Sequence, residues 1–250
     1  MIKTAIILAG GFGTRLRSVV NDVPKPMAMV NGIPFLNYQL NYLKYYGIKT
    51  AILSIGYLGE KIKEYYKNNF SEISILYANE PMPLGTGGGM RLAMEQADEK
   101  ELIVLNGDSF LDVNLTEFYN KHQEYRSDFS IAVRNAKNTD RYGTIVLSEY
   151  LSEDSSAKKH NNYYKLNDFR QKSEKTAEGI INGGVYIINK REFFRLTKQN
   201  YPFSIEKDFF ELKCSALKVG AYLSDGYFID IGIPEDYRKA QDDFKRFKYR

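Results

Sequence analysis

The first half of the chain alternates short apolar runs with amphipathic segments of helical length. Apolar runs typical of buried strands cover residues 2–8, 51–55, 73–77, 102–105 and 129–133. Segments with helical spacing lie between them, at residues 35–46, 58–70, 85–94 and 116–126, and Gly47 follows the first of these as a helix C-cap would. This alternation predicts an α/β fold with a doubly wound, mostly parallel mixed sheet. Ligands of such sheets bind beyond the carboxyl ends of the strands.

The second half is less regular, although it still predicts strands and short helices. Strands are expected at residues 143–147, 163–169, 180–188 and 217–222, and helices at 190–197 and 204–212. Residues 152–162 are polar and predict a surface loop. A last helix is expected from Pro234, with Tyr237, Ala240 and Phe244 on one face. No linker divides the chain, so we expect a single domain over residues 1–250.

Composition narrows the class of protein. The chain has 250 residues, enough for a large core, and its net charge is +4 with basic and acidic residues interspersed. This pattern argues against a nucleic-acid partner and suits a small anionic ligand. Cys214 is the only cysteine, so no internal disulfide forms, and no stretch is apolar enough for a membrane span or a leader. We therefore expect a cytoplasmic protein with no membrane partner.

The turn after the first strand reads LAGGFGTRL, from Leu8 to Leu16. Its three glycines (Gly10, Gly11 and Gly13) let backbone N–H groups approach a phosphate, while Thr14 adds a hydroxyl and Arg15 a planar fork. If only the glycines are considered, the alternative to phosphate binding is a tight turn between strand and helix. The P-loop motif is absent, Arg15 replaces the last glycine of a dinucleotide fingerprint, and no acid ends the second strand, which disfavours a dehydrogenase.

The stretch Pro24-Lys25-Pro26-Met27 places a lysine between two prolines. The prolines fix the local backbone and deny it helix. A lysine held in this way is a suitable counter-charge for a phosphate that gains charge during a reaction. A solvated lysine in a proline turn is the alternative.

These motifs, taken together with others, resemble a known family. The chain resembles the sugar-phosphate nucleotidyltransferases in these stretches, taken in order: GGFGTRL, PKPM, GTGGG at 85–89, NGD at 106–108, YG at 142–143, NGG at 182–184, SIEKD at 204–208 and FIDIG at 228–232. The resemblance covers nearly the whole chain. It implies a Rossmann-like, GT-A-like nucleotidyltransferase fold with a nucleotide-binding half, residues 1–135, and a sugar-phosphate-binding half, residues 136–250.

The resemblance implies that a nucleoside triphosphate and a sugar 1-phosphate give a nucleotide-sugar and pyrophosphate. It implies catalytic roles for Arg15 at the triphosphate, Lys25 at the α-phosphate and Asp108. It also implies that Asp108 and Asp230 bind Mg²⁺, an ion that prefers carboxylate and phosphate oxygens. Each acid closes an expected strand, so the sheet can bring the two together. The alternatives are a turn-forming Asp108 and a helix-initiating Asp230.

The resemblance also implies two sets of binding residues. The matched nucleotide-binding positions are Leu8, Ala9, Gly10, Gly11, Gly13, Thr14, Glu80, Gly85, Thr86, Asn106 and Gly107. The matched sugar-phosphate positions are Tyr142, Gly143, Lys172, Asn182 and Glu206. For Glu80 there are two alternatives: its carboxylate accepts hydrogen bonds from a guanine edge, or it is an ordinary surface acid. Around Lys172 the chain has Gln-Lys-Ser where many relatives have Glu-Lys-Pro. His122 and His160 have no ligand-like partner nearby, so we expect both to be solvated.

The compact length, EPMPLGTGGGM and FIDIGIPEDY are most similar to the bacterial D-glycero-α-D-manno-heptose 1-phosphate guanylyltransferases, which use GTP to make a GDP-heptose for surface polysaccharides. The sequence contains no hexapeptide repeat, so we expect no C-terminal left-handed β-helix. One alternative is a uridylyltransferase acting on a hexose or N-acetylmuramic acid 1-phosphate. Another is a non-catalytic regulatory subunit, which the presence of Arg15, Lys25 and Asp108 disfavours. The aromatic second half serves either a core or a homodimer surface.

Overall fold

The structure is a computed structural model. It describes residues 2–11, 13, 16, 19–20, 22–139, 142–148, 162–170 and 178–250. Four residues of the sequence predictions, Thr14, Arg15, His160 and Lys172, lie outside these ranges, as does most of the polar loop expected at 152–162.

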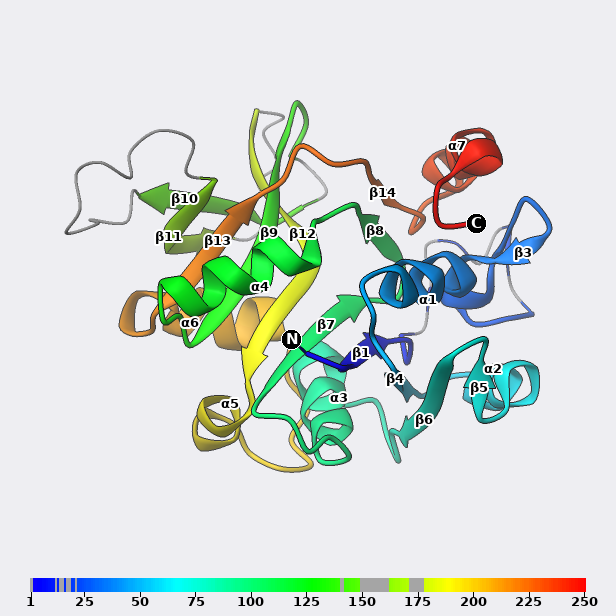
Figure 1. Cartoon of the computed structure of the whole chain (residues 1–250), viewed down its shortest axis with the longest axis horizontal. Coiled ribbons are helices and arrows are strands. Elements are labelled where there is room, and N and C mark those ends of the chain that lie inside the picture. The colour runs from blue at the N-terminus through cyan, green and yellow to red at the C-terminus, as the bar shows by residue number, and fades with distance from the viewer. Residues whose placement is uncertain are drawn as a thin grey trace.

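The chain alternates strands and helices through its first half (Figure 1). The elements of that half are β1 (Thr4–Leu8), β2 (Met29–Val30), β3 (Ile33–Pro34), α1 (Phe35–Tyr45), β4 (Thr50–Ile55), α2 (Gly59–Tyr66), β5 (Asn69–Phe70), β6 (Ile73–Asn79), α3 (Gly85–Met94), β7 (Glu101–Asn106), β8 (Ser109–Leu111), α4 (Leu115–Glu124) and β9 (Phe129–Ala136). Those of the second half are β10 (Thr144–Ser148), β11 (Tyr163–Arg170), β12 (Gly179–Asn189), α5 (Lys190–Leu196), the π-helix η4 (Ile205–Phe210), α6 (Glu211–Lys213), β13 (Val219–Leu223), β14 (Phe228–Asp230) and α7 (Pro234–Asp243).

Ten of the described strands form one sheet in the order β10-β11-β13-β9-β12-β7-β1-β4-β6-β5, and the pairs β2–β3 and β8–β14 form two further sheets of two strands each. Strands β6, β4, β1 and β7 are parallel neighbours, and β9 and β13 are parallel to each other. Strand β12 runs antiparallel between β7 and β9, and β11 and β5 also run against their neighbours. The predicted mostly parallel mixed sheet is thus confirmed, with the reversed strands on either side of its parallel centre.

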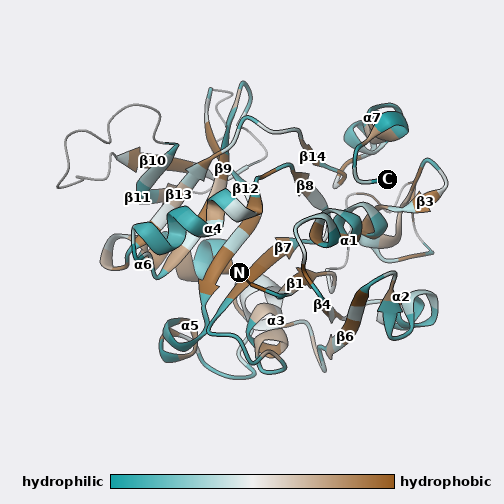
Figure 2. Ribbon diagram, in the orientation of Figure 1, coloured by the Kyte–Doolittle hydropathy of each residue, from teal (hydrophilic) through white to brown (hydrophobic). Residues whose placement is uncertain are grey.

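Two apolar cores lie on the two faces of the sheet, because successive side chains of a strand point to opposite faces. Ala5 and Ile7 of β1 join one core with residues of α1, α2, α4 and α7. Ile6 joins the other with residues of α3, α5 and η4. Figure 2 shows hydrophobic residues along the central strands β1 and β7 and hydrophilic residues over much of α2, α4, α5 and α7. Most Phe side chains of the second half are buried in these cores.

Several local expectations need correction. The helix expected over 58–70 ends at Tyr66, because Lys67 has a positive φ of 52° and the chain then turns into β5 against β6. Lys25–Met27 form one 3₁₀ turn, so the prolines exclude an α-helix there but not this tighter turn. The helix expected at 204–212 is a π-helix that continues into α6. Gly47 has a φ of 75°, as its expected place after α1 requires.

The prediction that His122 is solvated is wrong. Its side chain is fully buried under α4, and Nδ1 lies 2.7 Å from Ser130 Oγ of β9, which in turn lies 2.6 Å from the Tyr163 hydroxyl. Nε2 lies 3.4 Å from Glu101 Oε1, and this contact lowers the pKa of Glu101. Hydroxyl groups on the buried face of the sheet supply partners for an imidazole that helical spacing alone places at the surface.

Among the described helices, none combines the length and the apolar character that a bilayer crossing requires.

Candidate active site

The carboxyl ends of the parallel strands β1, β4, β6 and β7 lie at one edge of the sheet, and the segments that follow β1, β6 and β7 line a cavity of about 310 Å³. It is lined by Leu8, Ala9, Gly10, Gly11, Gly13, Lys25, Pro26, Glu80, Pro83, Gly85, Thr86, Asn106 and Asp108. Most of the predicted nucleotide-binding residues therefore come together. Gly107 is the exception among the described ones: it is buried below the cavity, where its N–H donates to the Leu8 carbonyl over 3.0 Å.

Glu80 is held firmly in the wall of this first cavity. Its carboxylate accepts from Ser54 Oγ over 3.0 Å and from the Leu84 N–H over 3.0 Å. Burial raises the pKa of Glu80. A Cβ added at Gly10 would collide with Glu80 Oε1 and lie 3.2 Å from the Gly56 nitrogen, so only glycine fits against this carboxylate. Glu80 is therefore not an ordinary surface acid.

The lysine of the proline turn points to the end of β7. Lys25 Nζ donates to Asp108 Oδ2 over 2.7 Å, and the exposed fractions of the two side chains are 9% and 38%. The alternative of a solvated Lys25 is thus excluded. Gln39 from α1 fixes the turn between β7 and β8, because its Nε2 donates to the carbonyls of Asn106 and Ser109. The pair places a nearly buried cation beside an accessible carboxylate.

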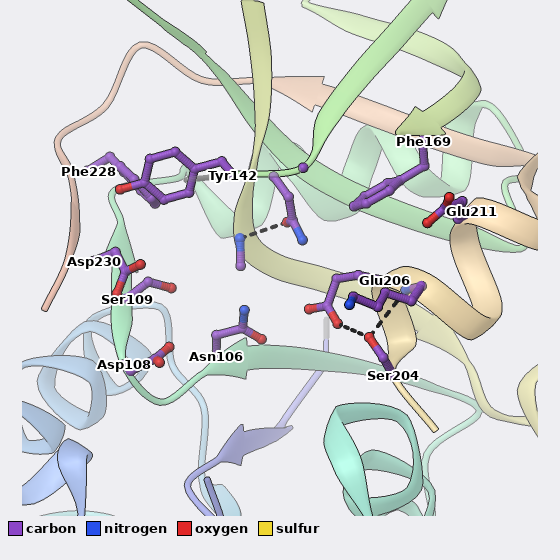
Figure 3. A pocket seen from close by; sticks show the side chains of 14 residues that line it. Asn106, Asp108, Ser109, Tyr142, Phe169, Ser204, Glu206, Glu211, Phe228 and Asp230 are labelled. Atoms are coloured by element: carbon purple, nitrogen blue, oxygen red, sulfur yellow. Dashed lines mark hydrogen bonds between the residues drawn. The ribbon is translucent and has the colours of Figure 1, made fainter. Parts of the chain in front are cut away.

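The structure also brings the two predicted metal ligands to one place. Strand β14 pairs antiparallel with β8, with Asp230 opposite Ser109, and the Ile231 N–H donates to the Asp108 carbonyl over 3.0 Å. Asp230 Oδ1 accepts from the Gly232 N–H over 2.7 Å, so the acid does not initiate α7. Both carboxylates line the same cavity (Figure 3). In the described residues no three His, Cys, Asp or Glu side chains cluster as a complete metal site.

A second cavity, of about 380 Å³, adjoins the first at Asn106 and Asp108. It is lined by Asn106, Asp108, Ser109, Tyr142, Gly143, Phe169, Asn182, Gly184, Ser204, Glu206, Lys207, Glu211, Phe228 and Asp230. All the predicted sugar-phosphate residues that the structure describes are among them. Figure 3 shows Asp108, Ser109 and Asp230 along one wall, with Ser204, Glu206 and Glu211 across the cavity from them.

Hydrogen bonds fix Glu206 in this second cavity. Its Oε2 accepts from Thr86 Oγ1 over 2.9 Å and from Ser204 Oγ over 2.8 Å. Its Oε1 accepts from the Tyr186 hydroxyl over 3.2 Å, and Asn182 Nδ2 donates to that hydroxyl over 2.7 Å. Burial and the nearby Glu206 charge raise the pKa of Tyr186, which keeps its proton available for this bond. Thr86, predicted to contact nucleotide, thus also positions an acid of the other cavity.

Sequence reasoning missed several lining residues. Ser109, Phe169, Ser204, Glu211 and Phe228 all line the second cavity. All five lie within five residues of a predicted site residue, since Ser109 follows Asp108, Ser204 and Glu211 flank Glu206, Phe228 precedes Asp230, and Phe169 precedes Lys172. Phe169 reaches the cavity from β11.

Two adjoining cavities at the carboxyl ends of parallel strands place this chain among the α/β proteins whose ligand site lies at that edge of the sheet. Residues 4–246 match the family described as nucleotidyl transferase, and the chain belongs to that family.

Two relatives are similar over almost their full lengths. One is the D-glycero-alpha-D-manno-heptose 1-phosphate guanylyltransferase of Aneurinibacillus thermoaerophilus, 41% identical over 97% of this chain and 99% of its own. The other is the enzyme of the same description from Campylobacter jejuni, 41% identical over 93% of this chain and 96% of its own.

Solved structures share the fold. HddC from Yersinia pseudotuberculosis, complexed with GMP-PN, is 34% identical, with a TM-score of 0.78 over 98% of this chain and all of that one. A UDP-glucose pyrophosphorylase complexed with UDP-glucose has a TM-score of 0.81 over 98% of each chain at 18% identity, a likeness of fold alone.

Proposed function

We propose that the protein transfers a guanylyl group from GTP to D-glycero-α-D-manno-heptose 1-phosphate, giving GDP-heptose and pyrophosphate. The observation that carries the proposal is the pair of cavities that meet at Asn106 and Asp108. The similarity to two heptose 1-phosphate guanylyltransferases and to a GMP-PN complex supports the choice of base and sugar.

The chemistry is an in-line displacement at phosphorus. An oxygen of the sugar phosphate forms a bond to the α-phosphorus of GTP, and the bond from that phosphorus to the bridging oxygen of pyrophosphate breaks. The nucleophile is already an anion, so no general base is needed. The difficulty is to bring two anions together in the correct geometry. The meeting point of the two cavities is where such a transfer has to occur.

The basic residues have distinct roles in this proposal. Lys25, only 9% exposed and held at the meeting point, stabilises charge that develops at the α-phosphate. Arg15 holds the triphosphate tail. The backbone of Gly10, Gly11 and Gly13 faces the phosphates, and Glu80 accepts from the N–H groups on the guanine edge. In the sugar cavity Glu206 accepts from ring hydroxyls, Asn182 accepts from or donates to them, and Lys172 donates to the sugar phosphate.

The donor set suits Mg²⁺. This ion is usually bound by one or two carboxylates together with phosphate oxygens and water, and Asp108 and Asp230 provide two carboxylates in one cavity. When bound, the ion would neutralise phosphate charge and orient the triphosphate. We also place the reaction in the cytoplasm, as the lone cysteine favours, with the GDP-heptose serving surface polysaccharide synthesis.

The test is pyrophosphate release with each of GTP, UTP, CTP, ATP and dTTP against heptose, mannose, glucose and N-acetylmuramic acid 1-phosphates. We expect GTP with heptose 1-phosphate to give the highest kcat/KM, and EDTA to abolish turnover. Highest activity with UTP would establish the uridylyltransferase alternative. Nucleotide-sugar binding without release from any pair would instead establish a regulatory subunit.

A further inference from the structure

Glu206 has one oxygen with spare hydrogen-bonding capacity in the sugar cavity. A carboxylate offers about four acceptor positions, two on each oxygen. Oε2 accepts from the hydroxyls of Thr86 and Ser204, whereas Oε1 accepts from the hydroxyl of Tyr186. Figure 3 shows one oxygen of Glu206 bonded to Ser204 and the other directed toward the open centre of the cavity. The second acceptor position of Oε1 is therefore the one left for a sugar hydroxyl.

Tyr186 lies behind this carboxylate oxygen. Its side chain is fully buried, and it is not among the described residues that line either cavity. Its hydroxyl lies 3.2 Å from Glu206 Oε1 and 2.7 Å from Asn182 Nδ2. A hydroxyl carries one proton and an ionised carboxylate can only accept, so the proton points to Glu206 and Asn182 has to donate. Tyr186 thus sets the direction of both hydrogen bonds.

A bulge in β12 brings Asn182 and Tyr186 together. Four residues of a regular strand span about 13 Å, which is too far for this contact. The register shifts after Asn182, which lies opposite Val133 of β9. Tyr186 lies opposite Ile131, so the two side chains are only two positions apart along β9. Gly184, with a φ of 75°, forms part of the bulge and donates its N–H to Asn182 Oδ1 over 2.9 Å, so the Asn182 amide is held at both ends.

The buried hydroxyl decides what Glu206 can offer to a sugar. With the hydroxyl present, one acceptor position of Oε1 faces the protein interior and the other faces the cavity. Without it, the inner position loses its donor, and an unpaired buried acceptor is costly. The carboxylate then gains by turning, and its direction toward the ligand is lost. Binding groups keep a productive geometry only when hydrogen bonds from behind lock their side chains.

We propose that Tyr186 is a positioning residue for the sugar 1-phosphate, which directs Glu206 Oε1 and the Asn182 amide at hydroxyls of the sugar ring. The inference rests on the proposed function for the identity of the ligand in the sugar cavity. It assigns a role in substrate recognition to a buried side chain that itself touches neither substrate. Loss of the hydroxyl should therefore weaken sugar binding and leave the transfer step almost unchanged.

The test compares Tyr186→Phe with the wild type, using the sugar 1-phosphate that gives the highest kcat/KM. We expect the KM for this sugar phosphate to rise about 10-fold, because a binding carboxylate loses a hydrogen bond that holds it. The kcat and the KM for the nucleoside triphosphate should each change about two-fold at most. This split between the two KM values is the readout that a merely structural role would not produce.

Tyr42→Phe is the matched control. Tyr42 is also fully buried, and its hydroxyl donates to the Val113 carbonyl over 2.8 Å without lining either cavity. Both variants should lower the melting temperature to a similar extent, whereas only Tyr186→Phe should change a KM. An unchanged KM for the sugar phosphate, equal increases in both KM values, or a melting temperature far below that of Tyr42→Phe would each overturn the role of Tyr186.

A double-mutant cycle with Glu206→Ala shows whether Tyr186 acts through Glu206. In the Glu206→Ala background, Tyr186→Phe should raise the KM for the sugar phosphate less than about three-fold, because the carboxylate that it directs is already absent. Fully additive increases would show that the two residues act independently and would contradict the proposal. Failure of the proposed function is distinguishable, because the wild type would then prefer another sugar phosphate, on which the same comparison is made.

Discussion

The two cavities are built from different parts of the chain and in different ways. The nucleotide-side cavity includes four glycines, three after β1 and one at the start of α3, which leave backbone open to the cavity. The sugar-side cavity is lined by directed side chains, such as Asn182, Glu206 and Glu211, from β12, η4 and α6. Backbone N–H groups suit a triphosphate, which is the same group whatever base the nucleoside triphosphate carries. Hydroxyl groups in a particular arrangement need acceptors at particular points.

The two cavities also share a boundary. Asn106 and Asp108 line both, and Asn106 Oδ1 is buried without a partner in the described part of the protein. Substitution at the boundary should affect both substrates, whereas substitution in one wall should affect one substrate only. This difference can be tested directly.

The largest effect is expected at the boundary. Asp108→Asn should lower kcat for guanylyl transfer about a thousand-fold, because the amide loses the charge proposed to hold the metal. The amide oxygen can still accept from Lys25, so the melting temperature should change little. Stopped assays of pyrophosphate release and a thermal melt measure the two quantities. Near-normal turnover in a folded variant would remove Asp108 from the reaction.

A smaller effect is expected at the glycines that line the nucleotide-side cavity. Gly10→Ala brings a Cβ against the Glu80 carboxylate, whereas a Cβ at Gly11 meets nothing within 4 Å. Overpacking of this kind costs about 1–3 kcal/mol. We expect Gly10→Ala to raise the KM for GTP about 10-fold and to leave the KM for the sugar phosphate unchanged.

Gly11→Ala is the matched control and should keep the stability of the wild type. Equal changes in the two KM values of Gly10→Ala would contradict the separation of the cavities. An equal loss of stability in both variants would show that glycine flexibility, and not the contact with Glu80, sets the requirement at Gly10.

Of the residues that line each cavity, the sequence analysis named a larger share on the nucleotide side than on the sugar side, and the reason is geometric. The glycine turn and Asp108 follow closely on the ends of β1 and β7, which pair in parallel, so the sheet brings them together. The sugar side depends on β12 running antiparallel beside β7 and on the β8–β14 pair, which link residues far apart in the sequence. Local periodicity carries no record of these pairings.

Individual side chains show the same limit. The sequence placed His122 in a helix, as found, but its burial depends on Ser130 and Tyr163 from other strands. Glu211 lies in the expected helical segment, yet the burial of its Oε2 without a hydrogen-bond partner among the described residues appears only once α6 packs against β11. A pattern predicts the element, while the polar partners of a buried group come from tertiary packing.

The smallest effect separates the base contact from the rest of the nucleotide cavity. Burial raises the pKa of Glu80 above its ordinary value of 4.5, and only the ionised carboxylate accepts through both oxygens. The KM for GTP should therefore rise as the pH falls through this raised pKa, by about three-fold to 10-fold if one charge-assisted bond is lost. The KM for the sugar phosphate, measured in parallel, should change less. Glu80→Gln should remove the pH dependence and leave a raised KM throughout.

The contribution of Glu80 to the free energy of unfolding should increase as the pH falls, while GTP binding weakens. This difference distinguishes lost binding from acid unfolding. A carboxyl group whose pKa is raised on folding holds its proton more tightly in the folded state than in the unfolded state. Its contribution to the free energy of unfolding therefore grows as the pH falls through the raised pKa and is lost as the pH rises. Urea unfolding of the wild type and Glu80→Gln across this range isolates that contribution as their difference. A wild type that loses stability relative to Glu80→Gln as GTP binding weakens would show that the carboxylate supports the fold and does not read the base.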